Sequence, residues 1–304
     1  MVPAAESPVA RLSVVVPSVN GWSDLEGCLA ALDRQRADIT LEVLVVDRLG
    51  EALRARVADT FSWAVVIPVP TETTIPDMRA CAFAQCTGDA VAVIEDHVIV
   101  PDGWARALVA ALNDGHDVVG GAVENAATET LLDWAAFLCE YSHCVPPLPA
   151  GPVAWLTGNN VAYRRVLLEQ CRDVLGAGRW ENVLHDALRA RGVELVCRPE
   201  IVVGHKKHYT FGEYLTQRYL YARSFAGARV ASEPLTKRLA YGVAAFGLAP
   251  VLYWRIVTRV LKKGRHTDRL WPSLPLLVPF VLSWAWGEVV GYWRGPGTAL
   301  SRVC

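Results

Sequence analysis

Five polar residues that could bind a ligand follow the ends of short apolar runs in the first third of the chain. They are Asn20, Asp47 and the triplet Glu95-Asp96-His97. The runs before them, rich in β-branched residues, are typical of buried strands: Leu12–Pro17, Leu41–Val46 and Ala90–Ile94. In a parallel sheet the carboxyl ends of the strands meet at one edge, where ligands bind. The sequence therefore predicts a ligand site assembled from these polar residues.

Helical patterns alternate with these strands, which positions the polar residues at one edge. Amphipathic stretches are expected at 23–35, 50–59 and 76–86, with a further strand at 63–68. This alternation predicts an α/β fold with a doubly wound sheet. Further along, the pattern predicts strands at 118–123 and 193–197, and helices at 128–142, after Asn160 and at 181–191.

Six segments resemble family 2 glycosyltransferases of the GT-A fold, in the family's order. The first three are SVVVPSVNG, VLVVD and DMRACAFAQCTGDAVAVIEDHVIVPDGW, and the others are WLTGNNVAYRR, WENVLHDALRARG and RPEIVVGH. The resemblance covers about residues 11–230. It implies a mixed GT-A sheet and transfer of a sugar from a nucleotide-sugar donor, with a UDP-sugar expected first.

The resemblance assigns the donor site to residues near the strand ends. Pro17 and Asn20 border the base, and Asp47 accepts hydrogen bonds from the base or ribose. Arg79 faces the diphosphate, and Glu95 with Asp96 completes the donor set. Two alternatives stay open, since Asp47 could cap a helix and Arg79 could be an ordinary surface arginine. The family's usual Asp-Gly-Ser after the acid is replaced here by Arg-Leu-Gly, so base recognition is expected to differ.

The same resemblance implies a divalent cation. Glu95-Asp96-His97 stands where the family has Asp-x-Asp, and His205 matches a family histidine near the metal or diphosphate. Asp96, His97 and His205 are therefore the expected ligands. An imidazole in place of a carboxylate favours Mn²⁺ over Mg²⁺.

Glu181 matches the family's catalytic acid, which implies a general base for the acceptor hydroxyl. Its usual Asp neighbour is Asn182 here, and Glu181 could instead stabilise a helix dipole. His185 and Asp186 lie one turn further along. Residues expected to contact the acceptor or diphosphate are Asn159, Asn160, Trp180, Gln217 and Arg218.

Charge divides the chain into an acidic body and a basic tail. Residues 1–233 hold 20 Lys and Arg against 29 Asp and Glu, whereas residues 234–304 hold 10 against 2, together with five of the 11 Trp. The division predicts a glycosyltransferase domain at 1–233 and a membrane-associated helical segment at 234–304. An acidic body argues against nucleic-acid binding, and a basic, Trp-rich tail favours a membrane surface.

Two uncharged stretches in the tail, 239–254 and 270–287, are short for crossing a bilayer, and three prolines interrupt the second. Because the basic stretch between them favours the cytoplasmic side, we expect both to lie in one leaflet at the cytoplasmic face of the cell membrane. Packing in a protein core and two true spans remain alternatives.

The start of the chain lacks signal-peptide character, and the eight Cys, without a C-x-x-C, are expected to be reduced. Zinc binding at Cys139, His143 and Cys144 is a weaker alternative, because structural zinc usually has four ligands.

Together these features predict an inverting glycosyltransferase acting on a glycan or lipid-linked acceptor at the membrane. Two other classes stay open. A catalytically decayed GT-A protein, kept for binding or as a scaffold, is consistent with His97 and Asn182. A nucleotidyltransferase shares the nucleotide-binding sheet but normally has a Gly-rich phosphate loop, and this chain has PSVNGWS there.

Overall fold

The computed structural model describes residues 8–176 and 178–303, which form two compact units. Unit 1 comprises the described residues of 1–123 and 148–205, and unit 2 those of 124–147 and 206–304. The boundary expected after residue 233 thus falls inside unit 2. Helix α8 (Phe211–Arg229) belongs to unit 2 because it packs along α11 (Thr267–Arg294).

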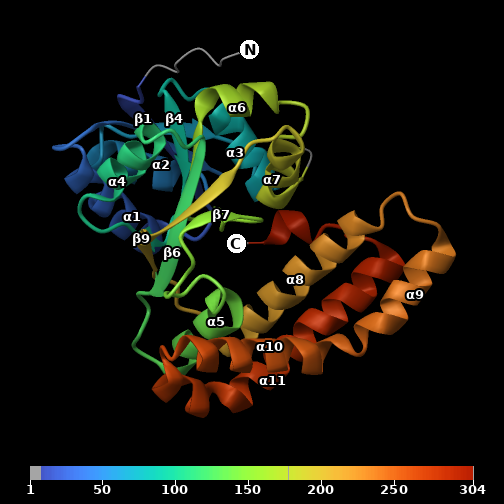
Figure 1. The fold of residues 1–304 in the computed structure, drawn as a ribbon. Helices are drawn as coiled ribbons and strands as arrows, with labels where there is room; N and C mark the ends of the chain where they lie inside the picture. Colours follow the sequence, from blue (N-terminus) through green and yellow to red (C-terminus); the bar gives the residue numbers. More distant parts are fainter. Residues whose placement is uncertain (1–7, 177, 304) are drawn as a thin grey trace. The chain divides into compact units, whose positions relative to one another are not determined.

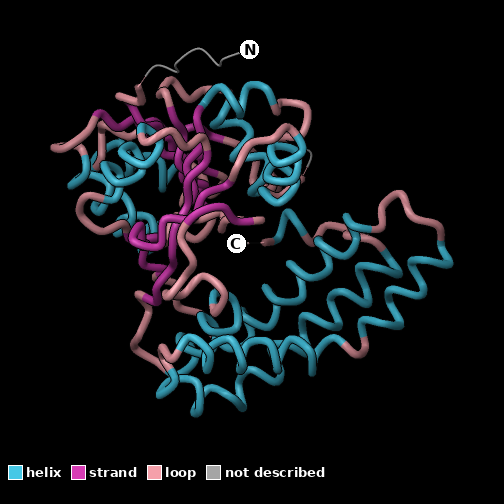
Figure 2. The backbone as a smooth tube through the Cα atoms, in the orientation of Figure 1, coloured by secondary structure: helices cyan, strands magenta, loops and turns pink. Residues whose placement is uncertain are grey.

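Unit 1 is built on a mixed sheet, which Figure 2 shows as the magenta strands. Its strand order is β3-β2-β1-β4-β8-β6-β9-β5, and β7 pairs with β9. The first four strands are parallel, and β8 runs antiparallel to β4. The strands are β1 (Arg11–Ser18), β2 (Thr40–Asp47), β3 (Val65–Pro68), β4 (Ala90–Val93), β5 (Val98–Ile99), β6 (Val118–Asn125), β7 (Gly151–Val153), β8 (Val161–Arg164) and β9 (Leu195–His205).

Helices cover both faces of this sheet, with α1 and α4 on one side and α3, α6 and α7 on the other (Figure 1). On the second side, Met78 and Leu188 pack with sheet residues such as Val91 in one buried cluster. Burial of such side chains contributes about 1.5–3 kcal/mol each. The helices are α1 (Trp22–Gln35), α2 (Glu51–Thr60), α3 (Ile75–Phe83), α4 (Trp104–Asn113), α6 (Arg165–Gln170) and α7 (Glu181–Ala190).

The expected α/β fold is confirmed, with differences around the antiparallel strands. The sequence predicts a helix directly after Asn160, but β8 comes first, because Val161 to Tyr163 are buried between β4 and β6. Strand β5 is only two residues long and shows no pattern of its own. Strand β9 extends to His205, well beyond the expected end at residue 197.

Unit 2 is helical. Helix α11 packs against the other helices of the unit, and Gly287 lets α8 come close, because a Cβ there would lie 2.5 Å from the Tyr219 carbonyl oxygen. The three prolines of α11 do not interrupt it, since this packing supports one continuous 28-residue helix. The helices are α5 (Leu131–Tyr141), α8, α9 (Leu235–Ala245), α10 (Leu248–Lys263) and α11, followed by a 3₁₀ turn at Leu300–Arg302.

Among the described residues, α11 is long and apolar enough to cross a membrane. Helices α9 and α10 together pass the same test of length and composition, but they are bent by 54° at their junction. Length and composition also fit a helix in a protein core, and 39% of the apolar window of α11 is buried within the protein.

Candidate functional site

Asp96 joins the ends of two strands at the point where the strand order reverses, between β1 and β4. Its buried carboxylate accepts hydrogen bonds from the Val19 and Asn20 amides at 2.8 and 2.9 Å, and from the Asn20 side chain at 2.7 Å. His97 Nδ1 lies 3.0 Å from the same carboxylate. The expectation that Asp96 binds metal directly does not fit this geometry, because its oxygens already hold the loop after β1 and the His97 ring.

The atoms that converge on a possible cation belong to Glu95, His97 and His205. His97 Nε2 lies 2.9 Å from His205 Nε2 and 3.4 Å from Glu95 Oε2, and His205 Nε2 lies 3.8 Å from the same Glu95 oxygen. Bonds of about 2.1 Å at right angles would put adjacent ligand atoms about 3 Å apart. Two imidazoles and a carboxylate suit Mn²⁺ better than Mg²⁺. The donor set and its spacing therefore fit a divalent transition metal.

A short antiparallel pairing brings His205 to this cluster. Val98 of β5 pairs with His205 of β9, which places His205 next to His97 although 108 residues separate them. Glu95 is positioned from a third segment, since the Asn159 amide donates to Glu95 Oε2 at 3.2 Å. The Thr157 hydroxyl holds the Asn159 side-chain oxygen at 2.7 Å. Asn159 thus acts on Glu95, where we had expected it to contact the acceptor.

Charge in the cluster is balanced between acids and imidazoles. Burial alone would raise the pKa of Glu95, but the hydrogen bond from His97 and the charges of both imidazoles and Arg79 lower that pKa to about 2. Burial alone would lower the pKa of His97, but the hydrogen bonds to Asp96 and Glu95 raise it to about 9.

Asp47 organises the turn between β2 and α2. It is fully buried and accepts hydrogen bonds from the Leu49 and Gly50 amides at 3.0 and 3.1 Å, and from Arg54 at 3.1 Å. Gly50 is the N-cap residue of α2, so Asp47 acts on the turn before the cap. Pro17 lies beside Val46 in the β1–β2 pairing, at the same edge of the sheet. Arg48, one of the departures from the family pattern, is buried and donates to the Thr73 carbonyl at 3.0 Å.

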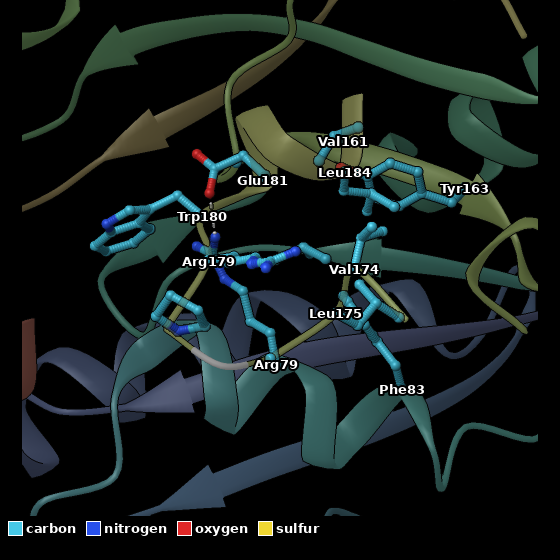
Figure 3. Close-up of a pocket in the computed structure, with 14 residues that line it drawn as sticks. Arg79, Phe83, Val161, Tyr163, Val174, Leu175, Arg179, Trp180, Glu181 and Leu184 are labelled. Carbon is cyan, nitrogen blue, oxygen red and sulfur yellow. Dashed lines mark hydrogen bonds and ion pairs between the residues drawn. The ribbon is translucent and has the colours of Figure 1, made fainter. Parts of the chain in front are cut away.

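Glu181 and Arg79 form an ion pair at a small cavity of unit 1. Figure 3 shows the two side chains pointing toward each other, and Arg79 Nη1 lies 2.9 Å from Glu181 Oε2. Gly158 makes room for this carboxylate, since a Cβ there would lie 2.5 Å from it. Trp180 also lines the cavity, whose free volume is about 30 Å³. That volume holds about one water, so a sugar needs the cavity to open.

Behind this ion pair lies a buried pair that the sequence patterns did not indicate. The Tyr163 hydroxyl lies 2.8 Å from His185 Nε2. Burial, reinforced by the charge of Arg79 and opposed by Glu181 and Asp186, lowers the pKa of His185 to about 4. His185 is therefore neutral near pH 7. Asp186, by contrast, is exposed and lies 3.7 Å from Arg189.

The remaining expected residues lie elsewhere. Asn160 is fully buried, where it accepts from Trp104 Nε1 and donates to the Ala122 and Ile201 carbonyls at 2.9 Å. This geometry makes Asn160 a structural residue, which corrects the expected acceptor contact. Gln217 and Arg218 belong to α8 in unit 2, whereas the cluster belongs to unit 1.

The family model for glycosyl transferase family 2 matches residues 13–173, just over half of the chain. The chain belongs to glycosyl transferase family 2. No curated protein sequence matched it.

Two solved structures are similar to this family 2 glycosyltransferase. One is GalNAc-T7 with UDP, GalNAc and Mn²⁺, at 15% identity and a TM-score of 0.53, covering 73% of this chain and 51% of that one. The other is the mannosyltransferase PcManGT from Pyrobaculum calidifontis with GDP-Man and Mn²⁺, at 20% identity and a TM-score of 0.50, covering 91% and 77%. The chain spans about half the length of the GalNAc-T7 chain. Identities this low show the fold alone, and they confirm the expected GT-A fold.

Proposed function

We propose that this glycosyltransferase binds a nucleotide sugar, first of all a UDP-sugar, together with Mn²⁺, and transfers the sugar with inversion. The observation that carries the proposal is the convergence of Glu95, His97 and His205 at the carboxyl end of β4. When bound there, a divalent cation would neutralise the negative charge of the departing diphosphate. Asp96 fixes the His97 ring, and Asn159 fixes Glu95, so the protein holds the ligands in place before the donor arrives.

Glu181 is the proposed general base. Its carboxylate would accept the proton of the acceptor hydroxyl as that oxygen attacks the anomeric carbon, and attack from the face opposite the diphosphate inverts the configuration. Arg79 holds Glu181 Oε2 in the donor-free state, while its own Nε is buried without a hydrogen-bond partner. A diphosphate would compete for the Arg79 guanidinium and release the carboxylate.

Unit 2 supports a proposed place at the cytoplasmic face of a membrane. Thirteen of the nineteen large apolar side chains that are exposed among the described residues lie between 235 and 293. Trp254, Trp271 and Trp286 are 68%, 58% and 54% exposed. Exposed apolar surface with tryptophan and arginine fits the headgroup region of a bilayer. Such a location suits a lipid-linked or membrane-emerging glycan as acceptor.

A protein that binds the donor without transferring the sugar is the second candidate. One observation favours it: Arg79 takes the carboxylate of Glu181 and the adjacent cavity is too small for a sugar. The two candidates share donor binding and differ in turnover. Binding and turnover are therefore measured separately.

The test measures the melting temperature of the full chain in mild detergent with UDP- and GDP-sugars, with and without Mn²⁺. Ligand at 100 times its Kd stabilises by about 2.7 kcal/mol, which is easily measured. His97→Ala should lose the Mn²⁺-dependent shift, whereas His116→Ala, in the same unit but outside the cluster, should keep it. Unchanged nucleotide affinity in His97→Ala would refute the metal assignment. Donor hydrolysis then separates an enzyme from a protein that only binds.

A further inference from the structure

Unit 2 contains a second group of charged side chains, which line a cavity of about 650 Å³ between α5, α8, α9, α10 and α11. Four arginines line it, two from α8 and two from α10: Arg218, Arg229, Arg255 and Arg259. Two carboxylates, Glu140 and Glu288, also line it, so arginines outnumber acids two to one. A volume between 300 and 1,000 Å³ is typical of sites for small ligands.

Three of these arginines make no close ion pair with a described residue. Arg218, Arg255 and Arg259 make no ion pair within 4.0 Å among residues 8–176 and 178–303. The Arg218 guanidinium stacks on Trp284 at 4.1 Å, and its Nε is buried without a hydrogen-bond partner. Arg255 and Arg259 are also one turn apart on α10, where like charges repel. Arg218 and Arg259 are half-buried, where an uncompensated charge costs free energy that a bound anion would recover, whereas Arg255 is exposed.

The acid on α11 is not available to these arginines. Glu288 accepts a hydrogen bond from Trp284 Nε1 at 2.8 Å and another from the Tyr292 hydroxyl at 2.9 Å. Arg229, the fourth arginine, lies 3.8 Å from Glu288 and also contacts Tyr292. Glu288 is thus used by its own neighbours. The second lining acid, Glu140, acts on Arg218, whose pKa its charge raises, and Arg255 and Arg259 on α10 face the cavity without an ion pair to either acid.

The positive charges near the cavity also affect His143, another residue that lines it. Burial, reinforced by the charges of Arg259 and Lys263, lowers the pKa of His143 to about 4. His143 is therefore neutral near pH 7 and adds no positive charge to the cavity.

The same wall of α10 is apolar toward its start. Leu248, Leu252 and Ile256 line the cavity on the face that continues to Arg259. Residues four apart share a face of a helix, and 11 residues span about 16 Å. Alanines of α9 extend the apolar part. The wall therefore changes from hydrocarbon to cationic along one direction, which matches a ligand with an apolar chain and an anionic head.

We propose that this cavity binds a phosphate-bearing lipid, with the phosphate on Arg218, Arg255 and Arg259 and the first part of the chain along Leu248 and Leu252. Guanidinium groups bind phosphate oxygens in pairs of hydrogen bonds, and several arginines on one phosphate make the contact strong. A free phosphate would leave the apolar wall unused. The inference goes beyond the proposed function, because it concerns binding at a second site and holds whether or not transfer occurs at the first.

The test measures binding of decyl phosphate to the full chain in a neutral detergent, by calorimetry, with decanol and inorganic phosphate as matched probes. Decyl phosphate is expected to bind at least tenfold more tightly than either. The variant Arg255→Gln/Arg259→Gln should weaken it by about 10- to 100-fold, since each hydrogen bond to a charged group contributes about 1.5–3 kcal/mol. The control, Lys262→Gln/Arg294→Gln, makes the same charge change at exposed residues outside the cavity and should bind as the parent does.

Leu252→Ala keeps the charge and shortens the apolar wall, so it should weaken decyl phosphate and leave inorganic phosphate unchanged. Melting temperatures without ligand check that each variant folds. Equal loss in the cavity variant and its control would overturn the proposal, because it would show attraction to overall charge only. Inorganic phosphate as tight as decyl phosphate would overturn the lipid part and indicate a polar anion site.

Discussion

The two charged sites of this molecule differ in whether their charged side chains have close partners within the protein. In unit 1, Asp96, Asp47 and Glu181 each have a donor or counter-ion within about 3 Å, and Asn159 holds Glu95. In unit 2, Arg218, Arg255 and Arg259 line a cavity with no ion-pair partner among the described residues. A catalytic site gains from ligands fixed in advance, because little reorganisation is then needed during the reaction. Uncompensated charge instead indicates a place where a ligand completes the structure.

The largest effect is expected on the rate of transfer, when the proposed general base Glu181 is changed. Glu181→Gln keeps the size of the side chain and removes its ability to accept a proton. Transfer should fall by about 10²- to 10⁴-fold while donor affinity stays nearly the same, as measured by steady-state kinetics and calorimetry. Asp186→Asn, at an exposed residue one turn later, is the control and should keep its rate. If Asp186→Asn loses the activity and Glu181→Gln keeps it, the base is one turn further along.

Acid should destabilise unit 1 through His185. The pKa of His185 is about 4 in the folded protein, below the ordinary value of about 6.5. As the pH falls, His185 is therefore protonated in the unfolded chain before it is protonated in the folded protein, which favours unfolding. This contribution is present above pH 6.5 and is lost as the pH falls toward 4, by about 3 kcal/mol in total. Denaturant unfolding of the parent and of His185→Gln between pH 7 and 4 measures it. The variant should show the shallower pH dependence, and identical slopes would contradict the assignment.

Two adjacent asparagines should respond differently. Asn159→Ala removes the donor that holds Glu95 and should weaken Mn²⁺ binding by about 10- to 100-fold with the fold intact. Asn160→Ala leaves the Ala122 and Ile201 carbonyls without their donor and should lower the free energy of unfolding by about 1–3 kcal/mol. Calorimetry with Mn²⁺ and thermal unfolding of both variants give the comparison. If both variants lost the same metal affinity and had the same stability, the assignment of a metal-site role to Asn159 and a structural role to Asn160 would be wrong.

The smallest effect reports on the cavity of unit 2. A phosphate placed beside Arg259 would offset the charge that helps to lower the pKa of His143. That pKa should therefore rise from about 4 when decyl phosphate binds, which NMR titration of the histidine ring can follow. His116, in unit 1, serves as the reference resonance and should not shift. A His143 pKa that stays constant at saturating ligand would place the phosphate away from this wall.

The sequence predicted the parallel half of the fold well, because strands such as Val14–Val16 are buried on both faces and show it as continuous apolar runs. It predicted the antiparallel half less well. Strand β5 has two residues, which is too short for a pattern, and it exists through its pairing with β9. Long-range pairing cannot be read from local periodicity.

Within the site, the sequence identified the triplet at 95–97 but not which members face the cation. Asp96 was expected as a ligand, whereas its side chain holds the loop after β1, and Glu95 joins His97 and His205. Asn159 and Asn160 show the same limit, since they lie in the turn before β8, where local periodicity does not say which way each side chain points. The cavity of unit 2 escaped prediction because its arginines come from two helices, α8 and α10, and meet only when these helices pack.

The pairing of Val98 with His205 places His205 beside His97 and also fixes the number of residues in β9 that lead to it. Strand β9 is held at its other end too, where Val196 pairs with Pro152 of β7. Removing one residue between these two pairings would turn the His205 side chain to the opposite face of the sheet, because successive side chains alternate. The cluster would then lose a ligand although all three of its residues remained in the chain. The number of residues in 198–204 is therefore itself a structural requirement of the cluster, which substitution scanning would overlook and single-residue deletions would expose.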